Sequence, residues 1–351
     1  MLSLETIIKR DNNNFDLIRL IAALAVIFGH SFELFNTYQY YEPVKAILGI
    51  DYSGTLAVYV FFFLSGILIT SSFFNKKNHF SYIIMRGFRI WPGLIACTFI
   101  TVFIIGPALT SVLLKEYFHS RLTWSFLFCN SIIYNIKYTL PGVFENNHYK
   151  GAVNGSLWTL PLEIFCYAVV FIIGSAISAK KTILKVCLFA LIIGAYFMNS
   201  HYWLGYFLNK PVLFFAAGSL SYAFRKYIFI NGKLSIVLFI LCCLFYSKPY
   251  FIYLFYVCFV YGMLALSSAD FFKKLKLPGD YSYGIYIYSF LVQQIFSHFL
   301  PNINPYESLI VTIPVIMILA YLSWHMVESP FLKLGRSLSA KISEKKVPLA
   351  I

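Results

Sequence analysis

The amino-acid sequence predicts an all-α fold, a polytopic membrane bundle of about ten transmembrane helices with both termini in the cytoplasm. Of its 351 residues, 60% belong to the apolar set AVILMFWYC and only 12% are charged. Soluble domains average about 45–50% apolar and about 25% charged residues. The mean hydropathy is +0.74, and the apolar residues are spread along the whole chain. This composition argues against a water-soluble globule, because too few polar side chains remain to cover the apolar surface.

Ten apolar runs approach the length of about 20 residues that a spanning helix needs. They cover residues 15–35, 54–74, 91–113, 157–178, 183–200, 210–224, 234–248, 250–267, 281–300 and 307–327. The runs 210–224 and 234–248 are the shortest and the weakest. The first run contains Arg19 and lacks a small-residue cleavage site, so we expect a retained helix and not a signal peptide. The more polar stretch 114–156 is expected to lie outside the membrane or to form a re-entrant segment.

The orientation follows from the distribution of Lys and Arg, because short cytoplasmic loops collect basic residues. With a cytoplasmic N-terminus, the cytoplasmic segments hold 20 of the 28 Lys and Arg residues and the opposite side holds 7. Every second loop is then basic, which favours an even number of spans. Membrane topology accounts for most of the net charge of +14, so no nucleic-acid partner is expected; the partner that the composition indicates is the lipid bilayer.

The chain divides into an integral-membrane domain, residues 1–334, and a tail, residues 335–351, that is rich in Lys and Ser. We expect this tail to be a solvated cytoplasmic end or a surface helix. The seven cysteines fall mostly inside apolar runs and form no CxxC or Cys/His cluster. They are interpreted as small core residues, and no metal site is predicted.

The first predicted helix carries the ionisable residues Asp16, Arg19 and His30, which are costly inside a membrane and by default mark a functional site. Arg19 and His30 are eleven residues apart, so they share one helix face within about 20° and differ in depth by about 16 Å. We therefore predict that they line one groove at two depths. Two structural alternatives stay open: Arg19 could extend to a lipid phosphate, and His30 could be an ordinary hydrogen-bonded residue.

Glu163 is the second unusual carboxylate, in the segment NGSLWTLPLE. Its span enters from the outside near Leu157, which places Glu163 about 9 Å deep, close to the depth of His30. A histidine and a carboxylate at one level can form a general base and its orienting partner, so His30 and Glu163 are predicted as catalytic residues. The alternative is that Glu163 accepts a hydrogen bond from Trp158 or a tyrosine and has no chemical role.

Arg86 and Arg89 lie three residues apart in MRGFRIWP, at the inner side of a predicted helix. Guanidinium groups suit bidentate binding of phosphate, which makes both residues candidates for an anionic ligand. The alternative is that they only set the membrane topology.

These segments resemble those of a known family, the integral-membrane acyltransferase family 3, which includes O-acetyltransferases of bacterial surface polysaccharides. The first-helix string FDLIRLIAALAVIFGH is similar to its Arg-to-His motif, and six further segments follow in the same order. They are FFFLSGILIT with Ser65, MRGFRIWP with Arg86 and Arg89, NGSLWTLPLE with Trp158 and Glu163, FFAAGSLSY around Gly218, YSYGIYIY with Ser282 and Tyr283, and VESPF with Glu328. The chain departs from the family at Ser289, where many members have a histidine, so that histidine's role is not carried over.

The resemblance implies transfer of an acyl group, usually acetyl from cytoplasmic acetyl-CoA, to a carbohydrate hydroxyl at the outer side of the bacterial inner membrane. Arg19, Arg86 and Arg89 would bind acetyl-CoA, a donor substrate and not a tightly bound cofactor. His30 would act as base or as acyl carrier, and the residues do not choose between these. The competing class is a small-solute transporter or polysaccharide exporter, against which stands the absence of recognisable inverted-repeat halves in the sequence.

Overall fold

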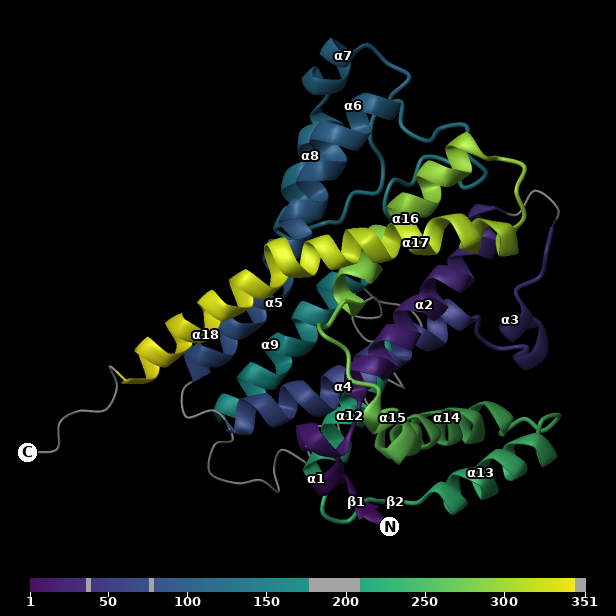
Figure 1. Ribbon diagram of the computed structural model, residues 1–351, viewed down its shortest axis with the longest axis vertical. Coiled ribbons are helices and arrows are strands. Elements are labelled where there is room, and N and C mark those ends of the chain that lie inside the picture. Colours follow the sequence, from purple (N-terminus) through teal and green to yellow (C-terminus); the bar gives the residue numbers. More distant parts are fainter. Residues whose placement is uncertain (36–38, 76–78, 177–208, 345–351) are drawn as a thin grey trace, which may run out of the picture.

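The structure is a computed structural model that describes residues 1–351 except 36–38, 76–78, 177–208 and 345–351 (Figure 1). The described part of the chain is mostly helical, and its one sheet is the antiparallel pairing of β1, Leu2–Ser3, with β2, Phe229–Ile230. The helices are α1 Leu4–Ile7, α2 Phe15–Leu34, α3 Pro43–Leu48, α4 Ser53–Asn75, α5 His79–Ile100, α6 Gly106–Leu109, α7 Leu114–His119, α8 Arg121–Ser131, α9 Leu160–Ala176, α12 Lys210–Ala223, α13 Gly232–Leu244, α14 Phe251–Ser268, α15 Asp270–Lys274, α16 Ser282–Phe299, α17 Pro305–Ser323 and α18 Ser329–Glu344. Short 3-10 turns cover Arg10–Asn12 and Gly155–Thr159, and π-helical turns cover Thr101–Ile105 and Trp324–Glu328.

Six helical segments of the described residues are long and apolar enough to cross a membrane, which makes the chain a helical membrane protein. They are Phe15–Leu34, Ser53–Asn75, His79–Leu109, Gly155–Ser175, Phe251–Ser268 and Pro305–Ile342. The expected span 183–200 lies outside the described residues. The expected spans 210–224 and 234–248 correspond to α12 and α13, which have only 14 and 13 residues. The count of about ten spans and the orientation of the termini therefore remain predictions.

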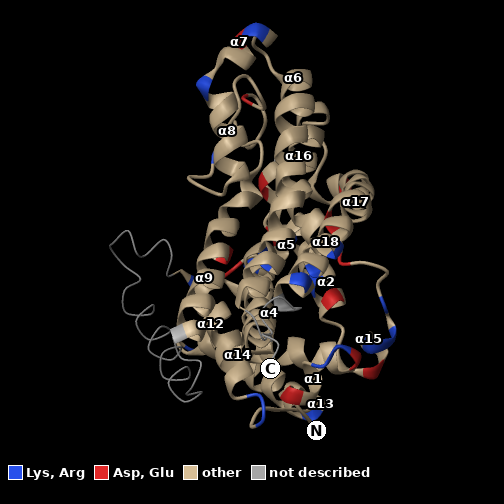
Figure 2. Ribbon diagram, turned by 90° about the vertical axis from the view of Figure 1, so that its left-hand side faces the viewer, with Lys and Arg blue, Asp and Glu red and all other residues tan. Residues whose placement is uncertain are grey.

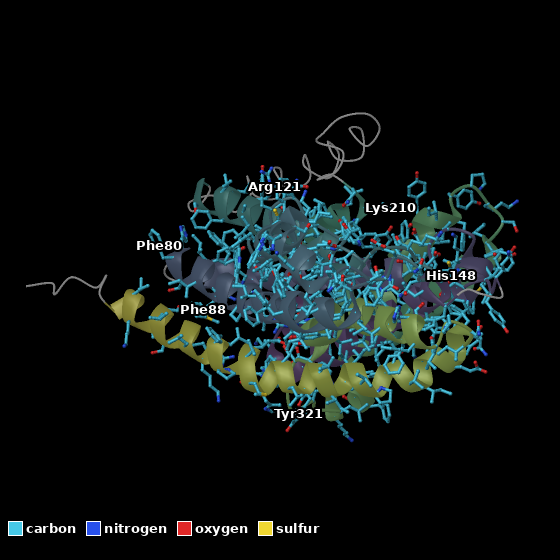
Figure 3. The ribbon with its side chains drawn as sticks, turned by 90° about the horizontal axis from the view of Figure 1, so that it is seen from above. Phe80, Phe88, Arg121, His148, Lys210 and Tyr321 are labelled. Atoms are coloured by element: carbon cyan, nitrogen blue, oxygen red, sulfur yellow. The ribbon has the colours of Figure 1, made fainter. Side chains whose placement is uncertain are left out.

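Two boundaries differ from those expected. The helix predicted from residue 91 begins at His79 and continues through a π-helical turn to Leu109, so Arg86 and Arg89 lie inside a long helix. At the other end, α17, the π-helical turn and α18 form one continuous helical rod along the side of the bundle, with Tyr321 on its outer face (Figure 3). The expected boundary between domain and tail at residue 334 lies inside this rod. Helix α18 packs against α5, and the backbone of Gly335 lies close to the Phe88 side chain of α5.

The parallel pair α2 and α16 is the framework on which the candidate site is built. Three links connect them in the same order along both helices: Arg19 to Asp280 just before α16, the Gln293 amide to the Ile27 carbonyl, and the Ser297 hydroxyl to the Leu34 carbonyl. Figure 2 shows charged residues at the α7 end, at the end with α1 and α15, and in the interior where α2, α5 and α18 meet. The interior group lies beside the first of the three links.

The start of α2 is held by Asn14. Its side-chain oxygen caps the helix by accepting from the Leu17 backbone N–H at 3.0 Å. Its amide nitrogen donates to the carbonyls of Phe272 and Leu275 at 2.7 and 2.6 Å. One buried asparagine thus satisfies the free backbone groups of two segments and joins α2 to the chain that leads into α16.

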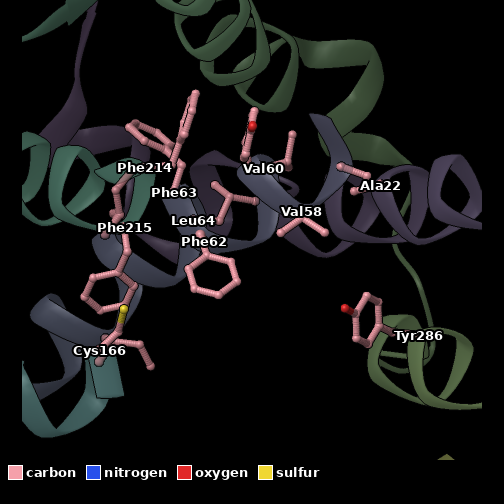
Figure 4. Close-up of a cluster of buried hydrophobic side chains, with 14 of the residues drawn as sticks. Ala22, Val58, Val60, Phe62, Phe63, Leu64, Cys166, Phe214, Phe215 and Tyr286 are labelled. Atoms are coloured by element: carbon pink, nitrogen blue, oxygen red, sulfur yellow. The ribbon is translucent and has the colours of Figure 1, made fainter. Parts of the chain in front are cut away.

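Helix α4 lies at the centre of the core and packs against α12 and α2. Figure 4 shows the apolar side chains of this cluster, among them Phe62 and Leu64 of α4, Phe215 of α12 and Cys166 of α9. The crossing of α4 and α12 is exceptionally close, because a Cβ on Gly66 would overlap the Phe215 carbonyl and a Cβ on Gly218 would overlap the Phe63 carbonyl. Small residues permit such backbone approach, which drives helix association in membranes.

This crossing predicts that Gly66→Ala destabilises the protein, because the added methyl group must push the two backbones apart. Overpacking of this kind costs about 1–3 kcal/mol, seen as a lower midpoint of thermal unfolding in detergent. The matched control is Gly262→Ala in α14, where a Cβ would meet no atom within 4 Å. That variant should be neutral or more stable, since alanine is the better helix former. Equal effects of the two substitutions would contradict the prediction.

Candidate active site

A cavity of about 120 Å³ lies between five helical segments and contains most of the residues that the sequence selects. Seven predicted site residues line it: Arg19 of α2, Ser65 of α4, Arg86 and Arg89 of α5, Glu163 of α9, and Ser282 and Tyr283 of α16. Apolar side chains such as Phe61, Phe62 and Leu68 form much of the remaining wall. The structure thus brings together motifs that lie far apart in the sequence.

A network of ion pairs runs along one side of this cavity. The Oδ2 atom of Asp280 lies 2.7 Å from Arg19 Nη1 and 2.7 Å from Arg89 Nη2. Arg89 also pairs with Glu328 at 3.3 Å, and Arg19 lies 3.7 Å from Asp16. The carboxylates therefore neutralise Arg19 and Arg89 and join α2, α5, the start of α16 and the π-helical turn before α18.

Asp280 is the residue of this network that the sequence reasoning missed. It lies in the connection before α16, and Ser282 donates a hydrogen bond of 2.6 Å to its Oδ1 atom. Burial opposes the charged form of the carboxyl, but Arg89, Arg19 and the hydrogen bonds from Ser282 outweigh this and lower its pKa to about 2. The available signal was a lone acid, two residues before Ser282, after a connection with three lysines. The role of Asp280 can be recognised only from its contacts with Arg19 and Arg89, which lie far away in the sequence.

Glu328 is the second carboxylate partner, and local backbone geometry presents it. It ends the π-helical turn Trp324–Glu328, and Ser323 donates to its Oε1 atom at 2.9 Å. Pro330 follows in α18 and has no N–H to donate to the preceding turn, which is compatible with the wider turn. The segment VESPF therefore places the buried Glu328 carboxylate against Arg89.

Arg86 differs from the other two arginines. Among the described residues it forms no ion pair, and its buried Nε atom has no hydrogen-bond partner. Its guanidinium lies 5.9 Å from the centre of the Tyr167 ring, and the Tyr167 hydroxyl donates a short hydrogen bond to Glu163. Arg86 is therefore the cavity arginine whose charge is available to an anionic ligand.

His30 lies outside the cavity wall, further along α2. Its ring packs edge-on against Phe290 with centroids 5.3 Å apart, and its buried Nδ1 atom has no partner among the described residues. Tyr283, Tyr286 and Phe290 follow one another at helical spacing on α16, and the first two line the cavity. One face of α16 thus leads from the arginines to His30, over a rise of about 10 Å.

The structure does not bring His30 and Glu163 into contact. In the described part of the chain Glu163 bonds to Tyr167 on its own helix, and no hydrogen bond joins it to His30. Its neighbours across the cavity are the arginines and Tyr283, whereas His30 contacts Phe290, two helical turns beyond Tyr283. A similar depth on two helices does not make two residues neighbours, because contact also depends on which helix faces point toward each other. The arrangement agrees better with the alternative in which a tyrosine bonds Glu163.

Trp158, Asp16 and Ser289, which the sequence also singled out, do not line the cavity. Trp158 packs against the main apolar core from the 3-10 turn. The side chain of Asp16 is 45% exposed and lies beside Arg19. Ser289 is buried and donates to the Tyr286 carbonyl of its own helix at 3.2 Å.

The fold and the cavity define a helical membrane protein with a partly apolar cavity lined by three arginines, and with a histidine outside it whose Nδ1 atom has no hydrogen-bond partner among the described residues. A family model described as an acyltransferase domain matches residues 12–325. The chain belongs to this family, acyltransferase family 3, and is a membrane acyltransferase.

Two relatives align over nearly the whole chain. An "O-acetyl transferase" of Shigella phage Sf6 is 30% identical over 339 residues, which cover 92% of this chain and 96% of the relative. "Nodulation protein 10" of Rhizobium leguminosarum bv. viciae is 26% identical over 361 aligned positions, which cover 94% and 95%. No solved structure matches significantly.

Asp280→Asn is predicted to destabilise the protein, because it leaves Arg19 without its 2.7 Å partner and Arg89 with Glu328 alone. Breaking a buried pair costs about 3–5 kcal/mol, measurable as a lower midpoint of thermal unfolding in detergent. The control Asp270→Asn removes an exposed acid that pairs only with Lys273 of its own short helix, and it should change little.

The same carboxylate predicts a pH dependence. Because the pKa of Asp280 is lower in the folded than in the unfolded protein, its contribution is complete above about pH 4 and is lost as the pH falls towards 2. The difference in stability between wild type and Asp280→Asn should therefore shrink over this range. A difference that does not change with pH would contradict the assignment.

Proposed function

We propose that this acyltransferase transfers acetyl from cytoplasmic acetyl-CoA to a hydroxyl of a surface polysaccharide, or of its lipid-linked precursor, at the outer side of the bacterial inner membrane. The observation that carries the proposal is the presence of two unpaired groups along the α2–α16 framework. Arg86 lines the cavity at one end and has no carboxylate partner among the described residues, and His30 lies further along with an Nδ1 atom that has no hydrogen-bond partner there. The first suits the phosphates of CoA, and the second suits proton transfer at a hydroxyl.

On the donor side, Arg86 is the main phosphate ligand in this proposal. Arg19 and Arg89 line the same cavity, but their charges are balanced by Asp280 and Glu328. In this scheme Arg19 and Arg89 stabilise the helices that form the cavity wall, and they contribute less than Arg86 to binding an anion. The rise of about 16 Å between Arg19 and His30 on one helix accommodates an extended pantetheine arm, which would bring the thioester to His30.

Glu163 supports the donor side in the same scheme. Its hydrogen bond from Tyr167 fixes the ring over which the Arg86 guanidinium lies. Glu163 thereby orients Arg86 through Tyr167 and contributes to donor binding more than to proton transfer at His30.

On the acceptor side, His30 acts in one of two ways. As a base, it takes the proton of the sugar hydroxyl while the oxygen attacks the thioester carbonyl, so that the C–O bond forms and the C–S bond breaks. The imidazolium then returns the proton to the CoA thiolate. As an acyl carrier, a ring nitrogen attacks the thioester carbonyl, so that a C–N bond forms, the C–S bond breaks and CoA leaves as the thiolate. The sugar oxygen then attacks the acyl-imidazole, so that the C–O bond forms and the C–N bond breaks, and the hydroxyl proton passes through the imidazole to the CoA thiolate. Both routes need the unpaired imidazole that the structure has.

His30→Ala should abolish acylation while leaving the protein folded, because general-base assistance alone contributes about 10²–10⁴-fold. The measurement is thioester-dependent acetylation by purified protein, together with mass spectrometry of surface glycans from cells with each variant. His119→Ala is the control, since that ring is exposed and bonds only the Lys115 carbonyl of its own helix. Normal turnover of His30→Ala refutes the role, and solute flux without acetyl-CoA would favour the transporter class.

Arg86→Gln should raise the KM for acetyl-CoA more than the KM for S-acetyl-N-acetylcysteamine, a thioester that lacks the phosphates. Loss of a charge-assisted contact predicts about a tenfold or larger change for the full donor. Arg121→Gln, on the exposed helix α8, is the control and should leave both values unchanged. Equal effects of Arg86→Gln on the two thioesters would mean that this arginine only supports the fold.

A further inference from the structure

Three residues near Phe290 each carry a buried polar atom that has no hydrogen-bond partner among the described residues. Five buried side-chain atoms in the described part of the chain lack a partner, and three of them are His30 Nδ1, Ser156 Oγ and Gln293 Oε1. The His30 ring contacts the Phe290 ring directly. Gly155, the neighbour of Ser156, is so close to Phe290 that a Cβ would lie 2.6 Å from its ring. Gln293 follows Phe290 by one helical turn.

The backbone around these atoms holds them in place. Gln293 donates from Nε2 to the Ile27 carbonyl at 2.9 Å, one turn before His30 on α2. Because a carbonyl can only accept, this bond fixes the amide orientation and leaves Oε1 as an unused acceptor. The backbone carbonyl of Ser156 accepts from the Tyr286 hydroxyl at 2.8 Å, and its N–H donates to Asn154. Ser156 is thus fixed by its main chain while its hydroxyl remains unused.

The fold uses the Nε2 atom of Gln293 but, among the described residues, neither Gln293 Oε1 nor the Ser156 hydroxyl. Ser156 is 1% exposed and Gln293 is 0% exposed. Burying these two unsatisfied oxygen atoms costs free energy. Buried polar groups without partners call for an explanation such as a bound ligand or a chemical role. Tyr149, whose ring also contacts Phe290, is 44% exposed, so the cluster lies close to the surface of the 144–156 segment.

We propose that His30, Ser156 and Gln293 form a subsite for two neighbouring hydroxyl groups of the sugar acceptor; the inference rests on the proposed function. One hydroxyl donates to the His30 imidazole and is the group that receives the acetyl. The adjacent hydroxyl donates to Gln293 Oε1 and accepts from the Ser156 hydroxyl. The donors and acceptors of a vicinal diol match the three unused atoms, whereas a single alcohol leaves at least one of them unpaired. Ser156 and Gln293 thereby select which hydroxyl is acetylated.

The test measures binding of methyl glucopyranoside, galactopyranoside and mannopyranoside to the purified full-length protein by saturation-transfer NMR, in the absence of donor. At least one of these glycosides, all of which carry vicinal hydroxyls, is expected to bind wild type. Ser156→Ala removes an atom that has no partner in the fold, so its folding should be intact. Its affinity for that glycoside should fall about tenfold, the effect of one hydrogen bond. Retention of wild-type affinity in Ser156→Ala, or no binding by any of the three glycosides, overturns the subsite.

A second variant, Gln293→Met, is measured in the same way, and its affinity for the glycoside should fall to a similar extent. Because it also removes the bond to the Ile27 carbonyl, Ser297→Ala serves as its control: that variant removes the neighbouring bond from α16 to α2 at the Leu34 carbonyl. Ser297→Ala should keep wild-type glycoside affinity, and equal losses in the two variants would count against the subsite. Acetyl-CoA binding is measured in parallel. Wild type that binds glycoside but not acetyl-CoA contradicts the proposed donor, while the reverse contradicts only the subsite.

Discussion

The bridging of Arg19 and Arg89 by the carboxylate of Asp280 is the interaction on which the rest of the site depends. Two guanidinium groups inside a helical membrane bundle repel each other and cannot remain there uncompensated. Asp280 contacts both at 2.7 Å, and Glu328 adds a second contact to Arg89. Through these contacts α2, α5, α16 and the α17–α18 rod meet at one point. The cavity lies beside this point and is lined by residues of α2, α4, α5, α9 and α16.

This arrangement separates two kinds of arginine that look alike in the sequence. Arg86 and Arg89 are three residues apart on one helix and line the same cavity. Arg89 is held by two carboxylates, whereas Arg86 rests against Tyr167 and keeps its charge available. The paired arginine joins the helices of the cavity wall, and the unpaired one is the candidate ligand for the phosphates of the proposed donor.

The framework also separates the residues that we propose for the donor from the histidine that we propose for the acceptor. Helices α2 and α16 run side by side, with Arg19 and Asp280 at one end and His30 and Phe290 further along. The close crossing of Gly66 and Gly218 fixes α4 against α12 and so keeps the second wall of the cavity in position. Gln293 is held by its bond from α16 to Ile27 of α2, and Ser156 by the bond from Tyr286 of α16 to the 3-10 turn. The helices packed around α2 and α16 therefore hold both Arg19 and His30 in position.

Much of this protein could be predicted from its sequence, because membrane insertion and helix periodicity are local properties. Composition and apolar runs predicted a helical membrane protein. Arg19 and His30 lie on one helix, α2, as predicted, but of these two only Arg19 lines the cavity. The ordered motifs indicated the acyltransferase family, which the family match confirms. The residues selected on this basis include seven that line one cavity.

Only the tertiary structure decided which residues are partners in the ion pairs and hydrogen bonds of the site. The contact of Arg19 with Asp280 joins residues 261 positions apart, and no periodicity within a helix reports which distant carboxylate balances a charge. The same limitation applied to Glu163, whose estimated depth suggested His30 but whose neighbours are Tyr167 and the arginines. Depth along a helix depends on where its turns begin and how it crosses its neighbours. Those are determined by side-chain packing between segments, and local sequence does not contain them.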